Sequence, residues 1–140
     1  MTKLDKSLIL DIVRCFDQIY NGTLFAINCR IRNRYFELLY YTRKKKLIEV
    51  RLVSSEGAVR RMMHLMKQKE LIPDHLYLVV REKEIIENSQ IPSDIGIILL
   101  DNTDLRLLRK SRVRKGSIPH ELFFKRVSDT MVGLLNKGGE

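Results

Sequence analysis

The sequence is poor in cysteine and has no long apolar run. Its 140 residues include two cysteines, Cys15 and Cys29, which form no C-x-x-C pair. Two cysteines in a chain of this length are not a disulfide framework, so we expect two buried thiols in a reducing, cytoplasmic compartment. The longest apolar stretch, Ile95 to Leu100, is far shorter than the ~20 residues that cross a bilayer. We therefore expect no membrane-spanning helix and no membrane partner.

Motifs for zinc and for nucleotide hydrolysis are also missing. The three histidines, His64, His75 and His120, lie far apart and share no zinc-ligand spacing with either cysteine. None of the seven glycines belongs to a G-x-x-x-x-G-K-[ST] loop, so nucleotide hydrolysis has no support. The pair Ser54-Ser55 has no partner base at a motif spacing, and helix capping explains both serines.

Positive charge is what the composition supplies in excess. There are 26 Lys and Arg residues against 17 Asp and Glu residues, a formal net charge of +9. A balance of this kind makes a polyanion the leading class of partner. The chain is 44% hydrophobic and 31% charged, which is typical of a soluble globular protein, and its length predicts one domain over residues 1–140.

The hydrophobic pattern alternates between the helical and the strand period. Apolar residues at helical spacing predict an amphipathic helix over residues 4–20, stopped by Asn21-Gly22. A period-two pattern predicts a strand from Thr23 to Arg34. Next we expect a hairpin of 35–41 and 47–53, followed by a helix that is capped by Ser54 or Ser55 and ends before Pro73. A strand is then expected at 75–80 and a loop or short helix at 81–90. The last expected elements are a hairpin of 95–100 and 105–108 around a turn at 101–104, and a closing helix at 119–135. A strand, helix, strand succession requires a crossover, so the predicted class is α/β with a mixed central sheet flanked by helices.

Three charged residues lie on the first predicted hairpin. Glu37 is on one strand, and Glu49 and Arg51 are on the other, where alternation points both to the same side. A metal-dependent phosphodiesterase needs oxygen ligands for a hard cation and a positive group beside the attacked phosphate. These three residues are the candidate catalytic set, with Glu37 and Glu49 as metal ligands.

The chain resembles the restriction-endonuclease-like, or PD-(D/E)XK, nuclease superfamily over most of its length. The segments that carry the resemblance are the first helix, the strand from Glu37 to Tyr41, Leu47-Ile-Glu49-Val-Arg51-Leu, Leu76-Tyr-Leu-Val-Val80, and Ile91-Pro-Ser-Asp-Ile-Gly-Ile-Ile-Leu-Leu-Asp101 followed by Leu105-Arg-Leu-Leu-Arg-Lys110. The resemblance implies a restriction-endonuclease-like core that cleaves phosphodiester bonds with Mg²⁺ or Mn²⁺. It also implies DNA rather than RNA as the partner, and a two-fold homodimer.

The candidate catalytic set departs from the family pattern at two positions. In the family an aspartate on the first hairpin strand and a glutamate on the second hold the metal, and a lysine two residues later serves the nucleophilic water. Here Glu37 replaces the aspartate and Arg51 the lysine. A guanidinium stays protonated, so Arg51 could neutralise a phosphate but could not act as a base.

The hairpin register decides whether the two glutamates can meet. They share a face only if paired residues have numbers that sum to an even value, which an odd-length loop achieves. A two-residue tip at Lys44-Lys45 would turn Glu37 away.

Basic residues give an expectation that does not depend on catalysis. Arg30, Arg32 and Arg34 alternate on the strand expected at 23–34, and further cations form the hairpin tip, follow the first hairpin and fill a run at 106–115. The predicted nucleic-acid contacts are Arg30, Arg32, Arg34, Arg43, Lys44, Lys45, Lys46, Arg60, Arg61, Arg109, Lys110, Arg112, Arg114 and Lys115. The alternative is a solvated surface that maintains solubility. Tyr35, Tyr40 and Tyr41, like Met62, Met63 and Met66, are expected in the core rather than against bases.

Three functions therefore compete. The first is a metal-dependent nuclease. The second is a catalytically inactive module with the same fold that grips DNA or RNA through Arg and Lys. The third is a small basic adaptor that docks on another protein through the closing helix at 119–135.

Overall fold

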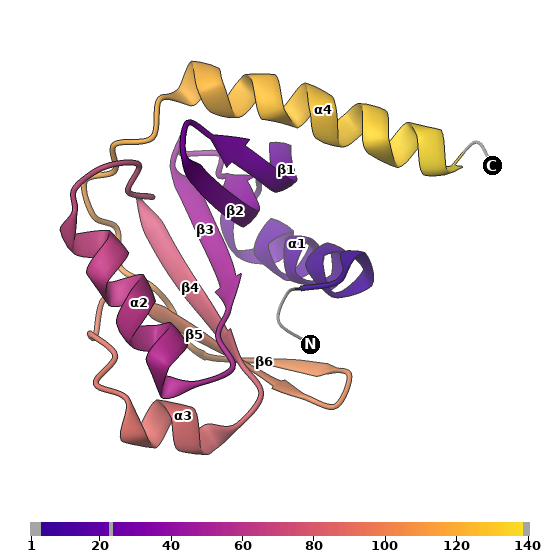
Figure 1. Ribbon diagram of the computed structural model, residues 1–140. Helices are drawn as coiled ribbons and strands as arrows, with labels where there is room; N and C mark the ends of the chain where they lie inside the picture. The colour runs from indigo at the N-terminus through magenta and orange to yellow at the C-terminus, as the bar shows by residue number, and fades with distance from the viewer. Residues whose placement is uncertain (1–3, 23, 139–140) are drawn as a thin grey trace.

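The computed structural model describes residues 4–22 and 24–138, which form four helices and six strands (Figure 1). In chain order the elements are α1 (Lys6–Tyr20), β1 (Leu24–Ile31), β2 (Arg34–Tyr41), β3 (Leu47–Leu52), α2 (Glu56–Lys67), β4 (His75–Val80), α3 (Lys83–Asn88), β5 (Gly96–Asp101), β6 (Asp104–Arg109) and α4 (His120–Gly138). Each predicted helix and strand is present, and the predicted strand at 75–80 coincides with β4. Thr23, the first residue of the strand expected at 23–34, lies outside the described residues.

Capping residues explain where α1 begins and ends and where α2 begins. The Asp5 carboxylate accepts a hydrogen bond from the Leu8 N–H at 2.8 Å and starts α1, and Asn21 stops it in the left-handed conformation at φ 49°. The Ser55 hydroxyl accepts from the Ala58 N–H at 3.1 Å and starts α2. The stop at Asn21 and the cap at Ser55 are those that the sequence predicted, whereas α1 begins two residues later than predicted, after the Asp5 cap.

One mixed sheet organises the chain, with the strands side by side in sequence order. The β1–β2–β3 and β5–β6 neighbours are antiparallel, whereas β3, β4 and β5 are parallel. Parallel neighbours need a crossover, and α2 and α3 supply the two crossovers. The α/β class with a mixed sheet flanked by helices is confirmed.

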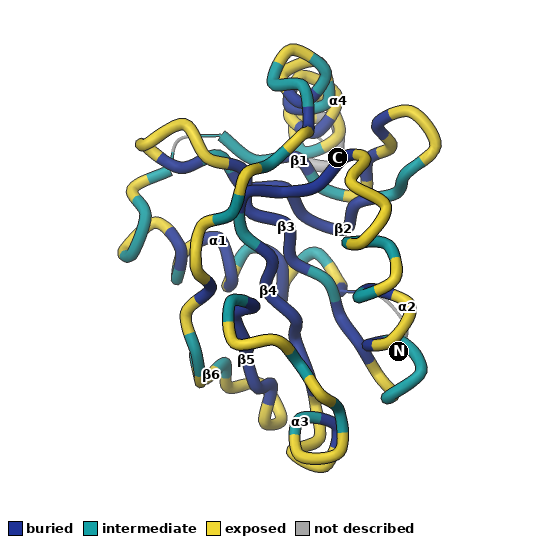
Figure 2. The backbone as a smooth tube through the Cα atoms, turned by 90° about the vertical axis from the view of Figure 1, so that its left-hand side faces the viewer, coloured by how far each residue is buried: buried dark blue, intermediate teal, exposed yellow. Residues whose placement is uncertain are grey.

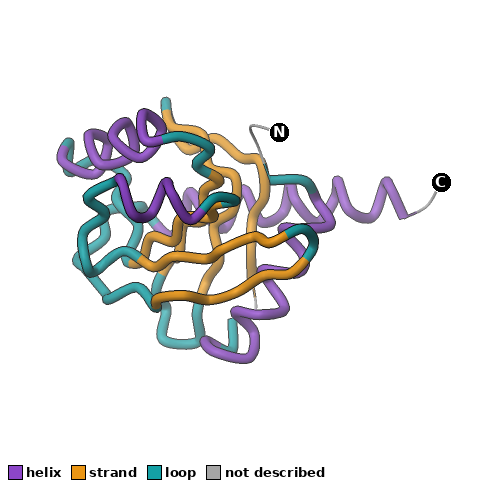
Figure 3. The backbone as a smooth tube through the Cα atoms, turned by 90° about the horizontal axis from the view of Figure 1, so that it is seen from below, coloured by secondary structure: helices purple, strands orange, loops and turns teal. Residues whose placement is uncertain are grey.

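Helices cover both faces of the sheet, as the view from below shows (Figure 3). On one face α1 packs on alternate side chains of the middle strands, such as Val50 and Val79. On the other face α2 and α3 cover Leu78 and its neighbours, while α4 covers the β1–β2 end. The middle strands are consequently the most buried part of the backbone (Figure 2).

The edge strand β1 is protected by α4. The Ile27 N–H donates to the Thr130 hydroxyl at 3.0 Å, and the Arg126 side chain donates to the Arg30 carbonyl at 2.7 Å. These bonds satisfy backbone N–H and carbonyl groups of the edge strand that could otherwise pair with a strand of another chain. The second half of α4 runs on past the sheet (Figure 1). Among the described residues, no helix is both long and apolar enough to cross a membrane.

The β2–β3 hairpin has the register that the candidate catalytic set requires. Leu39 is opposite Glu49 and Leu38 is opposite Val50, so paired numbers sum to an even value. The connecting loop has five residues, 42–46. The odd loop length places Glu37 on the same face of the hairpin as Glu49 and Arg51.

Three details of the sequence interpretation are wrong. Arg30, Arg32 and Arg34 do not alternate on one strand, because the chain turns at Arg32, where φ is 55°, and Arg34 begins β2. The turn expected at 101–104 is shorter, since β5 and β6 extend through Asp101 and Asp104 and Asn102 takes φ 58°. Of the two free thiols, Cys29 is buried but Cys15 is only half-buried; burial raises the pKa of Cys29 to about 11.

Candidate functional site

The carboxylate of Glu37 is buried and bonded to backbone groups. Its Oε1 accepts from the Leu4 N–H at 2.8 Å, and its Oε2 accepts from the Leu52 N–H at 3.0 Å. The Nε of Arg51 lies 3.9 Å from Oε2. Glu37 thus joins the segment before α1 to the end of β3.

Glu49 lies between two guanidinium groups and has no exposed surface. Its Oε1 forms an ion pair with Arg34, and its Oε2 lies 3.4 Å from Nη2 of Arg51. The other ends of the two arginines are also bonded, Arg34 to the Leu71 carbonyl and Arg51 to the Tyr35 carbonyl. Arg34, Glu37, Glu49 and Arg51 form one continuous group, in which the two glutamates are buried and the two arginines partly buried; it is named here the ion-pair cluster.

Desolvation opposes the charge of Glu49. Burial raises the pKa of this carboxyl above its ordinary value, and the positive charges of Arg34 and Arg51 work in the opposite direction. Desolvation is the larger of these effects, and the two arginines offset part of it.

The resemblance to metal-dependent nucleases implies Mg²⁺ or Mn²⁺ at Glu37 and Glu49, but in this geometry the donors do not fit such an ion. Both oxygens of Glu37 accept backbone hydrogen bonds, and both oxygens of Glu49 face guanidinium groups. Within residues 4–22 and 24–138, no three His, Cys, Asp or Glu side chains come together as metal ligands. A hard cation needs several free oxygens, and here it would have to displace two arginines.

A second site lies at the end of the sheet where the central strands β3 and β4 begin. A hollow of about 800 Å³ opens between the end of α1, the β2–β3 loop, the start of β4 and the segment after β6. Four cations line this hollow, Arg43, Lys44, Lys46 and Lys110, and the described residues that line it include no acid; Asp74, the acid that directly precedes His75, is bonded to backbone N–H groups. This site is named here the cationic hollow. It joins the hairpin tip to the basic run at 106–115, which the sequence predicted separately as nucleic-acid contacts.

The loop that carries three of these cations is ordered by hydrogen bonds. The buried Thr42 N–H donates to the Lys46 carbonyl at 2.9 Å, and the Lys46 N–H donates to the Thr42 hydroxyl at 3.1 Å. The Arg43 N–H donates to the Tyr20 carbonyl at 3.3 Å, which docks the loop on the end of α1. The ordered backbone limits the positions from which the three exposed side chains extend, so less freedom is lost when they bind a ligand.

Tyr20 and His75 supply the aromatic part of the wall. Their ring centroids are 5.6 Å apart with planes inclined by 53°. The hydroxyl of Tyr20 shares a hydrogen bond with that of Tyr77, and Nδ1 of His75 is 2.6 Å from the Ser111 hydroxyl. Burial and the Tyr77 bond raise the pKa of Tyr20, whereas burial lowers the pKa of His75. Both rings are neutral at pH 7.

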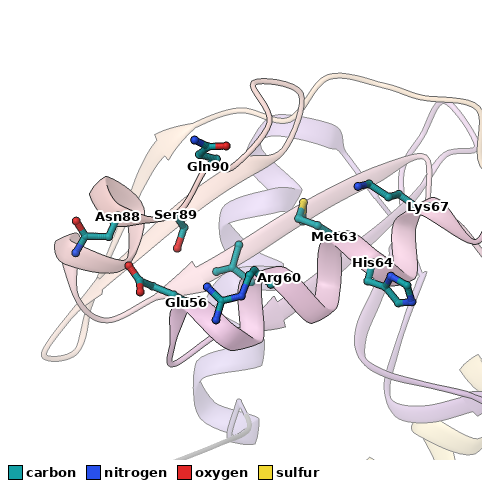
Figure 4. A pocket seen from close by; sticks show the side chains of 9 residues that line it. Glu56, Arg60, Met63, His64, Lys67, Asn88, Ser89 and Gln90 are labelled. Atoms are coloured by element: carbon teal, nitrogen blue, oxygen red, sulfur yellow. The ribbon is translucent and has the colours of Figure 1, made fainter.

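The remaining predicted contacts are spread over other surfaces. Arg60 lines a hollow of about 540 Å³ between α2 and residues 88–90, where Glu56 is also present (Figure 4). Arg61 lies beside it on α2. Arg30 faces Asp129 of α4 across another hollow, and Arg32 shares a third with Glu70. Acidic neighbours weaken the field at these places.

The basic run at 106–115 divides into structural and exposed residues. Arg109 donates to the Ile95 carbonyl at 2.8 Å and to the Pro92 carbonyl at 2.7 Å, and Arg114 forms an ion pair with Asp94. Lys110, Arg112 and Lys115 are exposed. Sequence reasoning grouped these five residues, but two of them hold the chain in place.

The closing helix and most of the expected core residues are where the sequence placed them. Tyr40 and Met62 are buried, Met63 and Met66 of α2 pack against the core, and Tyr41 stacks on Phe123 of α4. Tyr35 is an exception, because it is only half-buried and its hydroxyl donates to Oδ1 of Asn28 at 2.5 Å. The outer side of α4 exposes apolar side chains, namely Phe124, Met131, Val132 and Leu135.

Sequence reasoning missed Tyr20, His75 and Asp74 as site residues. The first two were assigned to a helix face and a buried strand, and Asp74 was not singled out, although its carboxylate accepts from the Leu47 N–H at 2.8 Å. No local motif marks them, because their partners are distant in sequence.

Comparison with known proteins adds a structural relative. A protein of unknown function from Silicibacter pomeroyi superposes with a TM-score of 0.66 at 14% identity, over 91% of this chain and 86% of that chain. No protein-family model matches the sequence, and neither does any curated protein. At this identity the likeness concerns the fold alone, so the two proteins share the arrangement of the sheet and its helices.

Proposed function

We propose that this protein binds nucleic acid through the cationic hollow and does not cleave it. The observation that carries the proposal is the convergence of cations from two distant segments, the β2–β3 loop and Lys110, on one hollow whose described lining residues include no acid. Phosphate backbones are recognised through such fixed groups of Lys and Arg. The net charge of +9 favours the same class of ligand at long range.

The ion-pair cluster supports binding without hydrolysis. The candidate catalytic residues lie together, but their charges are used within the protein: Glu49 pairs with Arg34 and Arg51, and Glu37 accepts two backbone hydrogen bonds. We propose a restriction-endonuclease-like core in which these positions hold the hairpin to its neighbours. The sheet order and the β2–β3 hairpin are compatible with that core.

A metal-dependent nuclease is the second candidate, and the hairpin register is the observation that favours it. The even sum of paired residues places Glu37 with Arg51 and Glu49, as the family pattern requires. Cleavage would require the arginines to leave the carboxylates.

One experiment separates these functions. Labelled single-stranded and duplex DNA and RNA are titrated with pure protein at several salt concentrations, then incubated with Mn²⁺ alongside Glu49→Gln. We expect salt-dependent binding and no cleavage, with log affinity falling by about 0.7 to 0.9 per phosphate contact against log salt. Metal-dependent cleavage that Glu49→Gln abolishes would select the nuclease. Absence of binding at low salt would reject the proposal and favour the adaptor.

A further inference from the structure

We propose that the cationic hollow accepts single-stranded rather than duplex nucleic acid, with a backbone phosphate on Arg43, Lys46 and Lys110 and a base against the rings of Tyr20 and His75. This inference rests on the proposed function and names the form of nucleic acid that the hollow takes.

The size and shape of the hollow favour a flexible strand. Its volume of about 800 Å³ is within the range of pockets that enclose a small molecule, so it can take about one nucleotide at a time. A duplex keeps its bases paired and stacked, and it presents phosphates on a stiff rod. A single strand can turn one base out of the stack and place it in a recess together with its phosphate.

The aromatic wall is positioned before any ligand arrives. Tyr20 is held by its hydroxyl bond to Tyr77 and by the edge of Phe16, whose ring centroid is 5.6 Å away. His75 is held by Ser111, which is itself buried. Rings fixed in this way offer a stacking surface to any base, because every base has a π-face.

The cations are held close to this wall. The Arg43 N–H bonds to the carbonyl of Tyr20 itself at 3.3 Å, so the backbone of the loop is docked on the residue that carries one of the two rings. Lys110 lies between two anchored residues, Arg109, which bonds to two carbonyls, and the buried Ser111. Phosphate and base contacts can therefore be made by neighbouring atoms of one nucleotide.

The hollow is also separate from the ion-pair cluster. It lies where β3 and β4 begin, whereas Glu37 bonds to Leu52 at the end of β3. Binding of a strand in the hollow thus requires no change at the carboxylates.

The test uses fluorescence anisotropy with labelled oligothymidylate of about 15 nucleotides, near the upper site size of a single-strand-binding fold, and a duplex of equal length. Lys46→Glu/Lys110→Glu is compared with Arg60→Glu/Arg61→Glu on α2, which removes the same amount of positive charge from another surface. We expect the first variant to weaken single-strand binding more than tenfold and to reduce the salt slope by about 1.4, since each single-strand phosphate contact contributes about 0.7. The control should weaken it less than threefold.

Two variants of His75 test the proposed contact between a base and its ring. His75→Ala should weaken single-strand binding about five- to tenfold, the lower part of the range for one stacked base. His75→Phe keeps a ring and should stay near the wild type, with folding of both variants checked by circular dichroism. Equal losses with Ala and Phe would overturn the base contact.

Other outcomes would overturn the inference as a whole. These are equal weakening by the two charge variants, tighter binding of duplex than of single strand, or competition by thymidine monophosphate at the affinity of the oligonucleotide. Preference for duplex removes this inference and leaves the proposed function standing, whereas failure of the wild type to bind any nucleic acid removes both.

Discussion

Asp74 and Leu47 are joined by two hydrogen bonds in opposite directions. The Leu47 N–H donates to Oδ2 of Asp74 at 2.8 Å, and the Asp74 N–H donates to the Leu47 carbonyl at 2.9 Å. The other carboxylate oxygen of Asp74 accepts from the Gly116 N–H at 3.1 Å. The buried Asp74 side chain thus connects the starts of β3 and β4 to the segment before α4, at the end of the sheet where the cationic hollow lies.

Replacement of Asp74 should be costly for stability. Asp74→Asn leaves one acceptor oxygen for two N–H donors and turns an amide group toward one of them. We expect the free energy of unfolding to fall by about 2 to 3 kcal/mol, the usual range for a hydrogen-bonded charged group. Urea unfolding measures the loss. Glu87→Gln, an exposed change on α3, should remain within about 0.5 kcal/mol of the wild type, and equal stability of Asp74→Asn would contradict the role given to the carboxylate.

Gly116 is required by the close approach of Asp74. A Cβ at this position would lie 2.6 Å from Oδ1 of Asp74 and 2.9 Å from the Ile72 carbonyl. We expect Gly116→Ala to destabilise by about 1 to 3 kcal/mol through this overlap. At Gly133 of α4 a Cβ would meet nothing within 4 Å, so Gly133→Ala should stabilise by up to about 1 kcal/mol. Thermal unfolding of the two variants should therefore shift in opposite directions, and a shift in the same direction would argue against this packing.

The ion-pair cluster makes a prediction that bears on the nuclease candidate. Glu49→Leu leaves the largely buried Arg34 without its counter-charge and leaves Arg51 with Glu37 alone, which should cost about 3 to 5 kcal/mol. The variant Arg34→Met/Glu49→Leu removes both charges of this pair and should recover most of that loss, because Arg51 keeps Glu37 beside it and no uncompensated charge stays buried. Chemical denaturation of both variants is the measurement. An unaltered stability of Glu49→Leu would show that the arginines do not depend on Glu49.

Burial of His75 should make the stability of the protein depend on pH. Burial lowers its pKa in the folded chain below the ordinary value of 6.5, so the unfolded chain binds the proton more readily. Stability is then complete above pH 6.5 and falls as the pH drops below it toward the folded pKa. Unfolding curves between about pH 7.5 and 5.5 should show this decline. His75→Phe should reduce the decline, whereas substitution of the exposed His64 by Gln should leave it, and an equal decline in both variants would contradict the assignment.

Local patterns were sufficient for the helices and strands. The short β-branched and aromatic run from His75 to Val80 and the helical spacing before Asn21 correspond to β4 and α1 within about a turn, because composition, period and capping are properties of neighbouring residues. The cationic character of the hairpin tip was also visible in the sequence. The grouping of Arg30, Arg32 and Arg34 failed because a turn at Arg32 replaced the expected strand.

The sequence by itself determined an α/β chain with a mixed sheet, an excess of positive charge, and two acids and an arginine on one hairpin. Only the tertiary structure decided that Glu49 pairs with Arg34 and Arg51, and that Tyr20, His75 and Lys110 border one hollow. The physical reason is that burial and charge pairing depend on which distant segments meet when the helices pack on the sheet, and such meetings leave no periodic trace along the chain.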